Sequence, residues 1–110
     1  MMRPPLSPAA AGLMRGILRR VDISRERILI SDFRSVDWQS LTLVGERHHI
    51  RLHVPPPDSG QIVDRLTNGL EDAEFVIAGQ IVADIAVIGT PHVEADGSVT
   101  VEIEALTIAE

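Results

Sequence analysis

Residues 38–54 read WQSLTLVGERHHIRLHV, and this stretch decides the predicted fold. Gly45-Glu46 suits a two-residue hairpin turn with glycine in its first position. Such a turn pairs Leu43 with His48, Leu41 with Ile50 and Gln39 with Leu52 on one face of the ladder. The other face then pairs Trp38 with His53 and carries a mainly polar and basic set: Trp38, Ser40, Thr42, Val44, Arg47, His49, Arg51 and His53. One aliphatic and one polar face are typical of a half-buried antiparallel sheet.

The residues before this hairpin predict a helix and a further strand. Ser7-Pro8 is typical of a helix start, and an apolar stripe at intervals of three and four predicts a helix from about Pro8 to Arg20. We expect this basic amphipathic helix to dock on its own domain, the alternative being a membrane-surface or partner-binding element. Residues 27–33 look like a strand, and residues 1–6 form a start that we expect to be loose.

The residues after the hairpin predict a second helix and two more strands. Asp58 and Gln61 form a capping-box signature, followed by a helical stripe that ends near Asn68-Gly69. Residues 75–90 are mostly apolar and predict a strand, with a bulge at Gly79 and an interruption at Pro91. Residues 94–98 predict a three-residue hairpin loop that places Val93 opposite Val99 and His92 opposite Thr100.

The predicted order is therefore α-β-β-β-α-β-β within one α+β domain spanning residues 1–110. Helices packed on one face of a mainly antiparallel sheet are the expected architecture. A ferredoxin-like arrangement, which contains a split βαβ unit, is the leading hypothesis.

Charge is divided unequally along the chain, which carries a net charge of −6. Nine of the ten arginines lie in the first 51 positions, whereas eleven of the sixteen acids follow Pro56, and lysine is absent. Opposite halves attract within a chain or between copies, so we expect a homo-oligomer, most simply a dimer, or docking on another protein. A nucleic-acid role fits poorly with the net charge and with the scarcity of aromatic residues.

The chain has no cysteine and no apolar run of membrane-spanning length, so the sequence predicts a protein of the cytoplasm that does not enter a membrane. The first 21 residues carry four arginines and no acid, which leaves an organellar targeting segment as an alternative for that region. None of the common phosphate-loop, zinc or nucleophile motifs occurs, and no cofactor is predicted.

The polar face of the hairpin is the first candidate site, and its proposed ligand-binding residues are Trp38, Arg47, His49, Arg51 and His53. Arginine binds carboxylate and phosphate, histidine titrates near neutral pH, and Trp38 could cover a cation. The set suits a small anionic ligand. Alternatively, it is a solvated sheet face, or one covered by acids from the C-terminal half, in the same chain or in a second subunit. No metal site is predicted, because His49 and His53 would lie about 13 Å apart on one strand.

Asp84 is the second candidate, as a catalytic base. It stands alone in an apolar strand, where a carboxylate removed from water has a raised pKa unless it is paired. A small enzyme or ligand-binding protein would then hold its pocket between the Arg47–His53 strand and the Asp84 strand, with Arg51 binding the anion. The alternatives are an edge strand with Asp84 facing solvent, or a structural pair with an arginine.

Overall fold

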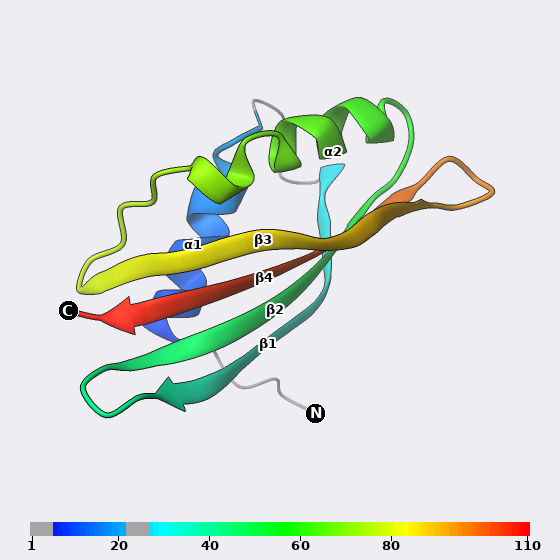
Figure 1. The fold of residues 1–110 in the computed structure, drawn as a ribbon. Helices are drawn as coiled ribbons and strands as arrows, with labels where there is room; N and C mark the ends of the chain where they lie inside the picture. The colour runs from blue at the N-terminus through cyan, green and yellow to red at the C-terminus, as the bar shows by residue number, and fades with distance from the viewer. Residues whose placement is uncertain (1–5, 22–26) are drawn as a thin grey trace.

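The computed structural model describes residues 6–21 and 27–110, so the predictions made for residues 1–5 lie outside the described residues. The protein is α+β, with two α-helices and a four-stranded antiparallel sheet (Figure 1). The elements in chain order are α1 (Pro8–Leu18), β1 (Leu29–Gln39), β2 (Val44–Val54), α2 (Ser59–Thr67), the short 3₁₀ helix η2 (Leu70–Asp72), β3 (Gln80–Val93) and β4 (Val99–Ala109).

The strand order across the sheet is β1-β2-β4-β3. Because β2 and β3 are each antiparallel to β4, they are parallel to one another, with β4 between them and α2 in their connection. These elements form a split βαβ unit. A complete ferredoxin-like arrangement is not confirmed, since the strand order and the number of helices fit it only loosely.

The hydrophobic core lies between one face of the sheet and the helices. Alternate residues of β2 and β4 point into it, among them the wholly buried Ile50, Leu52 and Ile103. α1 contributes Leu13, Met14 and Ile17, and α2 contributes Ile62, Val63 and Leu66. Both helices therefore bury their apolar stripes against the same side of the sheet. The opposite side, which we call the open face, carries neither helix.

The prediction of two separate strands before Gly45 is wrong. Residues 29–39 form the single strand β1, which pairs with β2 from Leu29 opposite His53 to Gln39 opposite Val44. The predicted turn at Gly45-Glu46 is also wrong, because the chain reverses at Leu41-Thr42. The backbone N–H of Ser40 donates to the carbonyl of Leu43 at 2.9 Å, and the Ser40 hydroxyl accepts from the Leu43 N–H at 3.1 Å. A serine side chain thus supplies the turn chemistry that we had assigned to glycine.

Gly45 has a different role from the one predicted. It is buried within β2, and a Cβ atom at this position would collide with the carbonyl oxygen of Thr107 in β4. The absence of a side chain lets the two backbones approach closely.

The start of α1, the register of the β3–β4 loop and the end of α2 are confirmed, whereas the end of α1 and the capping box of α2 are not. α1 begins after Ser7, whose hydroxyl accepts from the Ala10 N–H at 3.1 Å, although the helix ends at Leu18 rather than Arg20. The β3–β4 loop has the predicted register, with Val93 opposite Val99 and Gly97 in the left-handed region at φ 91°. α2 ends at Thr67 as expected, but the capping box is absent: Asp58 has φ 62° and its side chain makes no capping bond.

The strands β1 and β3 are the two edges of the sheet. β1 has one register shift, between Ile30 and Asp32. β3 has two, between Val82 and Asp84 and between Ile88 and His92, so the bulge predicted at Gly79 is misplaced. Gly79 instead lies in the turn before β3, and the strand continues through Pro91.

Candidate functional site: the open face of the sheet

All six predicted site residues lie on the open face. Arg47, His49, Arg51 and His53 alternate along β2 with inward-pointing His48, Ile50 and Leu52. Trp38 lies opposite Gly45, and Asp84 follows Arg47 and Leu106 in one row across β2, β4 and β3. The predicted pairing of Trp38 with His53 is wrong, because His53 lies opposite Leu29 at the other end of the hairpin.

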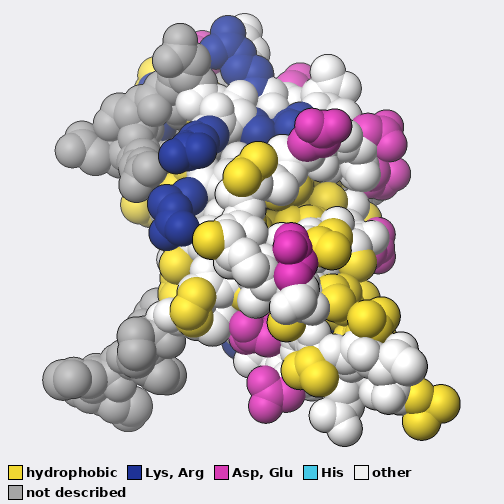
Figure 2. Space-filling model, turned by 90° about the vertical axis from the view of Figure 1, so that its left-hand side faces the viewer, with side chains coloured by type: hydrophobic (Ala, Val, Ile, Leu, Met, Phe, Trp, Pro, Cys, Tyr) yellow, Lys and Arg dark blue, Asp and Glu magenta, His cyan; other side chains and the backbone are white. Residues whose placement is uncertain are grey.

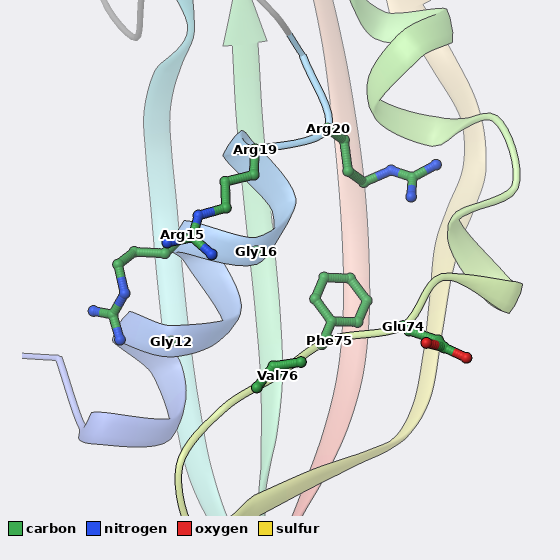
Figure 3. Close-up of a pocket in the computed structure, with 8 residues that line it drawn as sticks. All are labelled: Gly12, Arg15, Gly16, Arg19, Arg20, Glu74, Phe75 and Val76. Atoms are coloured by element: carbon green, nitrogen blue, oxygen red, sulfur yellow. The ribbon is translucent and has the colours of Figure 1, made fainter.

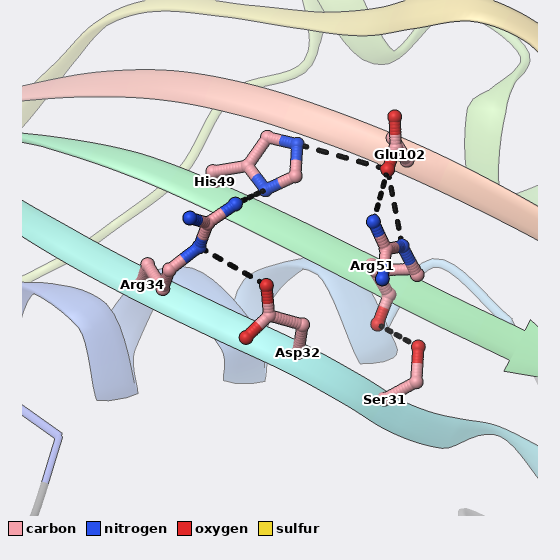
Figure 4. Close-up of polar contacts among 6 residues, drawn as sticks. All are labelled: Ser31, Asp32, Arg34, His49, Arg51 and Glu102. Atoms are coloured by element: carbon pink, nitrogen blue, oxygen red, sulfur yellow. Dashed lines mark hydrogen bonds and ion pairs between the residues drawn. The ribbon is translucent and has the colours of Figure 1, made fainter.

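A chain of charged and polar contacts crosses three strands of this face (Figure 4). Arg34 Nε lies 3.1 Å from Asp32 Oδ2, and its Nη2 lies 3.4 Å from His49 Nδ1. His49 Nε2 lies 3.9 Å from Glu102 Oε1. The same carboxylate oxygen accepts from Arg51 Nε at 3.0 Å and from Arg51 Nη2 at 2.9 Å.

These contacts neutralise much of the charge that made the face a candidate anion site. Glu102 belongs to the acidic C-terminal half, so the alternative of a basic face covered by acids of the same chain is realised at Arg51. Exposed ion pairs of this kind contribute about 0.2–1 kcal/mol each. Their main consequence is to orient His49 and the arginines. His53 makes a separate contact, with Nδ1 3.2 Å from Thr100 Oγ1.

Arg47 and Asp84 differ from their neighbours, because neither has an ion-pair partner among residues 6–21 and 27–110. Both side chains are exposed. The strand β4 separates them, which puts their backbones about 10 Å apart. Neither hollow on this face is lined by both residues.

The expectation that Asp84 is withdrawn from water is wrong, since it is exposed on an edge strand. Two hollows open on this face. One of about 380 Å³ is lined by Arg34, Arg47, His49 and Glu104, among others, and one of about 350 Å³ by Arg51, Ile88, His92 and Glu102, among others. Asp84 lines neither hollow. The geometry that a catalytic Asp84 requires is thus missing, and its predicted role as a base has no support here.

His48 is the residue whose importance sequence reasoning missed. It is wholly buried on the inner face, with Nδ1 2.7 Å from Ser35 Oγ and Nε2 2.8 Å from Thr107 Oγ1. Burial lowers the pKa of His48, and nearby Glu46 opposes this effect. The only available signal was its alternation with Ile50 and Leu52. Because a hydroxyl rather than a carboxylate holds Nε2, the Ser35–His48–Thr107 chain lacks the group that stabilises an imidazolium in a catalytic triad.

Across the described part of the chain, no three His, Asp or Glu side chains lie close enough together to hold a metal ion. Within the same residues, no helix has both the length and the apolar character needed to cross a bilayer. Comparison with models of protein families, with curated proteins and with solved structures finds no match to this chain.

Proposed function

We propose that this protein acts by self-association, as a two-fold symmetric dimer built on the open face. The observation that carries the proposal is an apolar area at the end of the open face that bears the β1–β2 turn. It consists of Val36 and Trp38 in β1, Leu106 in β4 and Ile81 in β3, with Gly45 and Arg47 of β2 between them, and we call it the apolar end. Val36 is 60% exposed and Ile81 is 53% exposed. Trp38 and Leu106 are half-buried between them, and exposed apolar areas of this kind mark interaction sites.

The arrangement of charge supports a second copy as the partner. Val36, Arg47, Leu106 and Asp84 form one row across the sheet. A two-fold axis running along β4, between two copies packed face to face, would place Leu106 over its own equivalent. The same operation places Arg47 of each copy over Asp84 of the other. Two charges that have no ion-pair partner among the described residues of one chain would therefore pair twice in the dimer, across sheets about 10 Å apart.

The same axis brings Glu102 and Glu104 of the two copies toward one another farther along β4. Packed sheets cross at about 30°, so the axis bisects the two β4 strands near Leu106 and the glutamates are displaced sideways from one another farther along β4. Repulsion between these like charges disfavours close contact beyond the apolar end, while Glu102 keeps its partners within the chain.

Light scattering after size-exclusion chromatography tests the proposal. The wild type should have twice the chain mass of 12.0 kDa at a concentration of about 100 µM. Leu106→Arg should give a monomer with unchanged far-UV circular dichroism. Val76→Arg is the matched control, because Val76 is wholly exposed and lies outside the sheet, so the dimer should remain.

Charge reversal tests the geometry of the interface. Arg47→Asp and Asp84→Arg should each weaken the dimer, and combining them should restore it, because the charges would again be opposite. Added salt should weaken the wild-type dimer. A monomeric wild type refutes self-association, whereas a dimer that Leu106→Arg leaves intact refutes this surface.

A further inference from the structure

A second feature lies on the helical side of the molecule, away from the open face. A hollow of about 430 Å³ lies between α1 and residues 74–76. Figure 3 shows its eight lining residues: Gly12, Arg15, Gly16, Arg19, Arg20, Glu74, Phe75 and Val76. In the side view, basic side chains gather at the upper left of the molecule and most acidic ones lie to the right (Figure 2). The volume suits a small organic ligand.

Two glycines of α1 let the following segment approach the helix. A Cβ atom on Gly12 would lie 2.6 Å from Ile77 Cγ2, and one on Gly16 would collide with the ring of Phe75. Phe75 therefore packs directly on the helix backbone and is half-buried, while Val76 beside it is wholly exposed. An apolar surface is thereby held against a helix that carries arginines.

The three arginines that line the hollow differ in their contacts with the rest of the chain. Arg20 is engaged: its Nε donates to the carbonyl of Leu66 at 3.0 Å, and its Nη2 donates to the carbonyl of Asn68. Arg15 and Arg19 are exposed, and neither has an ion-pair partner among the described residues. In Figure 3 both extend to the same side of α1, and Glu74 points away from them.

Arg15 and Arg19 are four positions apart, so they lie one helical turn, about 5.4 Å, from each other. Like charges at this spacing destabilise a helix, and α1 contains no acid to offset them. A bound anion would relieve the repulsion. The C-terminal end of the helix carries a partial negative charge of about half a unit, which repels an anion. This repulsion is smaller than the attraction of the two guanidinium charges.

We propose that this hollow binds a phosphate monoester with an apolar or aromatic body. Arg15 and Arg19 hold the phosphate, because two planar guanidinium groups match its charge and its oxygens. Phe75 and Val76 contact the apolar body, and Arg20 forms a fixed wall. The site lies outside the sheet, so it does not depend on the dimer proposed above. The phosphate monoester could belong to a soluble metabolite or to a lipid headgroup.

Isothermal titration calorimetry with phenyl phosphate and with inorganic phosphate tests the site. We expect saturable binding of phenyl phosphate that is tighter than that of inorganic phosphate. The double variant Arg15→Gln/Arg19→Gln should weaken phenyl phosphate binding at least about tenfold. The matched control is Arg34→Gln/Arg65→Gln, which removes the same charge from β1 and α2 and should bind as the wild type does. Val76→Ser should weaken phenyl phosphate and leave inorganic phosphate unchanged.

Cosedimentation with phosphatidylcholine vesicles containing phosphatidic acid distinguishes the two sources of the ligand. Binding to these vesicles without binding to phenyl phosphate, if lost in Arg15→Gln/Arg19→Gln, supports the site and assigns it to a lipid headgroup. Two results would overturn the proposal: no binding to either probe up to about 10 mM phosphate groups, or an equal loss in the two double variants.

Discussion

The buried His48 predicts a pH dependence of stability. The Thr107 hydroxyl donates to the Glu46 carbonyl 3.5 Å away, so the His48 tautomer with its proton on Nε2 satisfies every group: Nε2–H donates to Thr107, and Ser35 donates to Nδ1. Burial lowers the pKa of His48 in the folded state, and in the unfolded state the pKa returns to about 6.5. Below pH 6.5 the unfolded chain therefore takes up a proton that the folded chain does not.

The sign follows from linkage. Above about pH 6.5 the neutral ring is present in both states, and its contribution to stability is complete. As the pH falls from 6.5 toward the lowered folded pKa, the free energy of unfolding should decrease by up to about 1.4 kcal/mol per pH unit. Below the folded pKa both states are protonated, and this loss stops.

His48→Gln isolates this contribution, because glutamine keeps a donor and an acceptor but does not titrate. At pH 7.5 the variant should lose about 2–3 kcal/mol, from weaker hydrogen bonds and from the edge-to-face contact with Phe33 at 6.1 Å. Between pH 7.5 and 5.5 the difference between wild type and variant should shrink, because only the wild type loses the stability that the lowered pKa of His48 supplies.

Urea unfolding followed by far-UV circular dichroism at a series of pH values, at one fixed protein concentration, measures both quantities. All other groups are the same in both proteins, so subtracting the two curves removes their contributions. A constant difference from pH 7.5 to 5.5 would contradict the assignment of His48 as a buried neutral group. So would a variant as stable as the wild type at pH 7.5.

Three further substitutions test close packing and capping. Gly45→Ala should lower the free energy of unfolding, measured by thermal denaturation, by about 2–4 kcal/mol, because the new methyl group meets the β4 backbone. Gly60→Ala in α2 has open space around the new methyl group and should raise the free energy of unfolding by about 0.5–1 kcal/mol. Equal effects of these two alanines would refute the close approach. Ser7→Ala should lower the unfolding free energy by about 1 kcal/mol, because the hydrogen bond to the Ala10 N–H is lost. Urea denaturation measures this effect. An unchanged midpoint would contradict the role of Ser7 as a helix cap.

The faces of the hairpin were predictable even though its turn was not. The predicted pairing put Trp38 opposite His53, whereas the structure pairs it with Gly45, eight positions away. Because side chains alternate with a period of two, an even shift leaves the β2 residues on their predicted faces, whereas Leu41 and Leu43, predicted to face the core, lie at the turn and are exposed. Ile50 and Leu52 are accordingly buried and Arg51 is exposed, as expected.

The pairing itself depended on features that local pattern does not contain. Gly45 resembles a turn residue, and only the presence of β4 beside it explains why glycine is needed. In the same way, the contacts of Arg51 with Glu102 and of His48 with Thr107 join residues 51 and 59 positions apart. They arise from the insertion of β4 between β2 and β3, which also separates Asp84 from the arginines. Tertiary assembly thus determined the site, while period and turn residues determined the elements.

The two edges of the sheet differ in how readily they accept a further strand. Two register shifts and Pro91 interrupt the outer side of β3, so it is a poor template for backbone hydrogen bonding. By contrast, β1 pairs without interruption from Asp32 to Gln39 and contains no proline. Strand addition between copies would therefore use β1 of each chain and stop after one such junction. By edge pairing alone, each chain can then join only one other chain, so this contact does not by itself extend into a fibre.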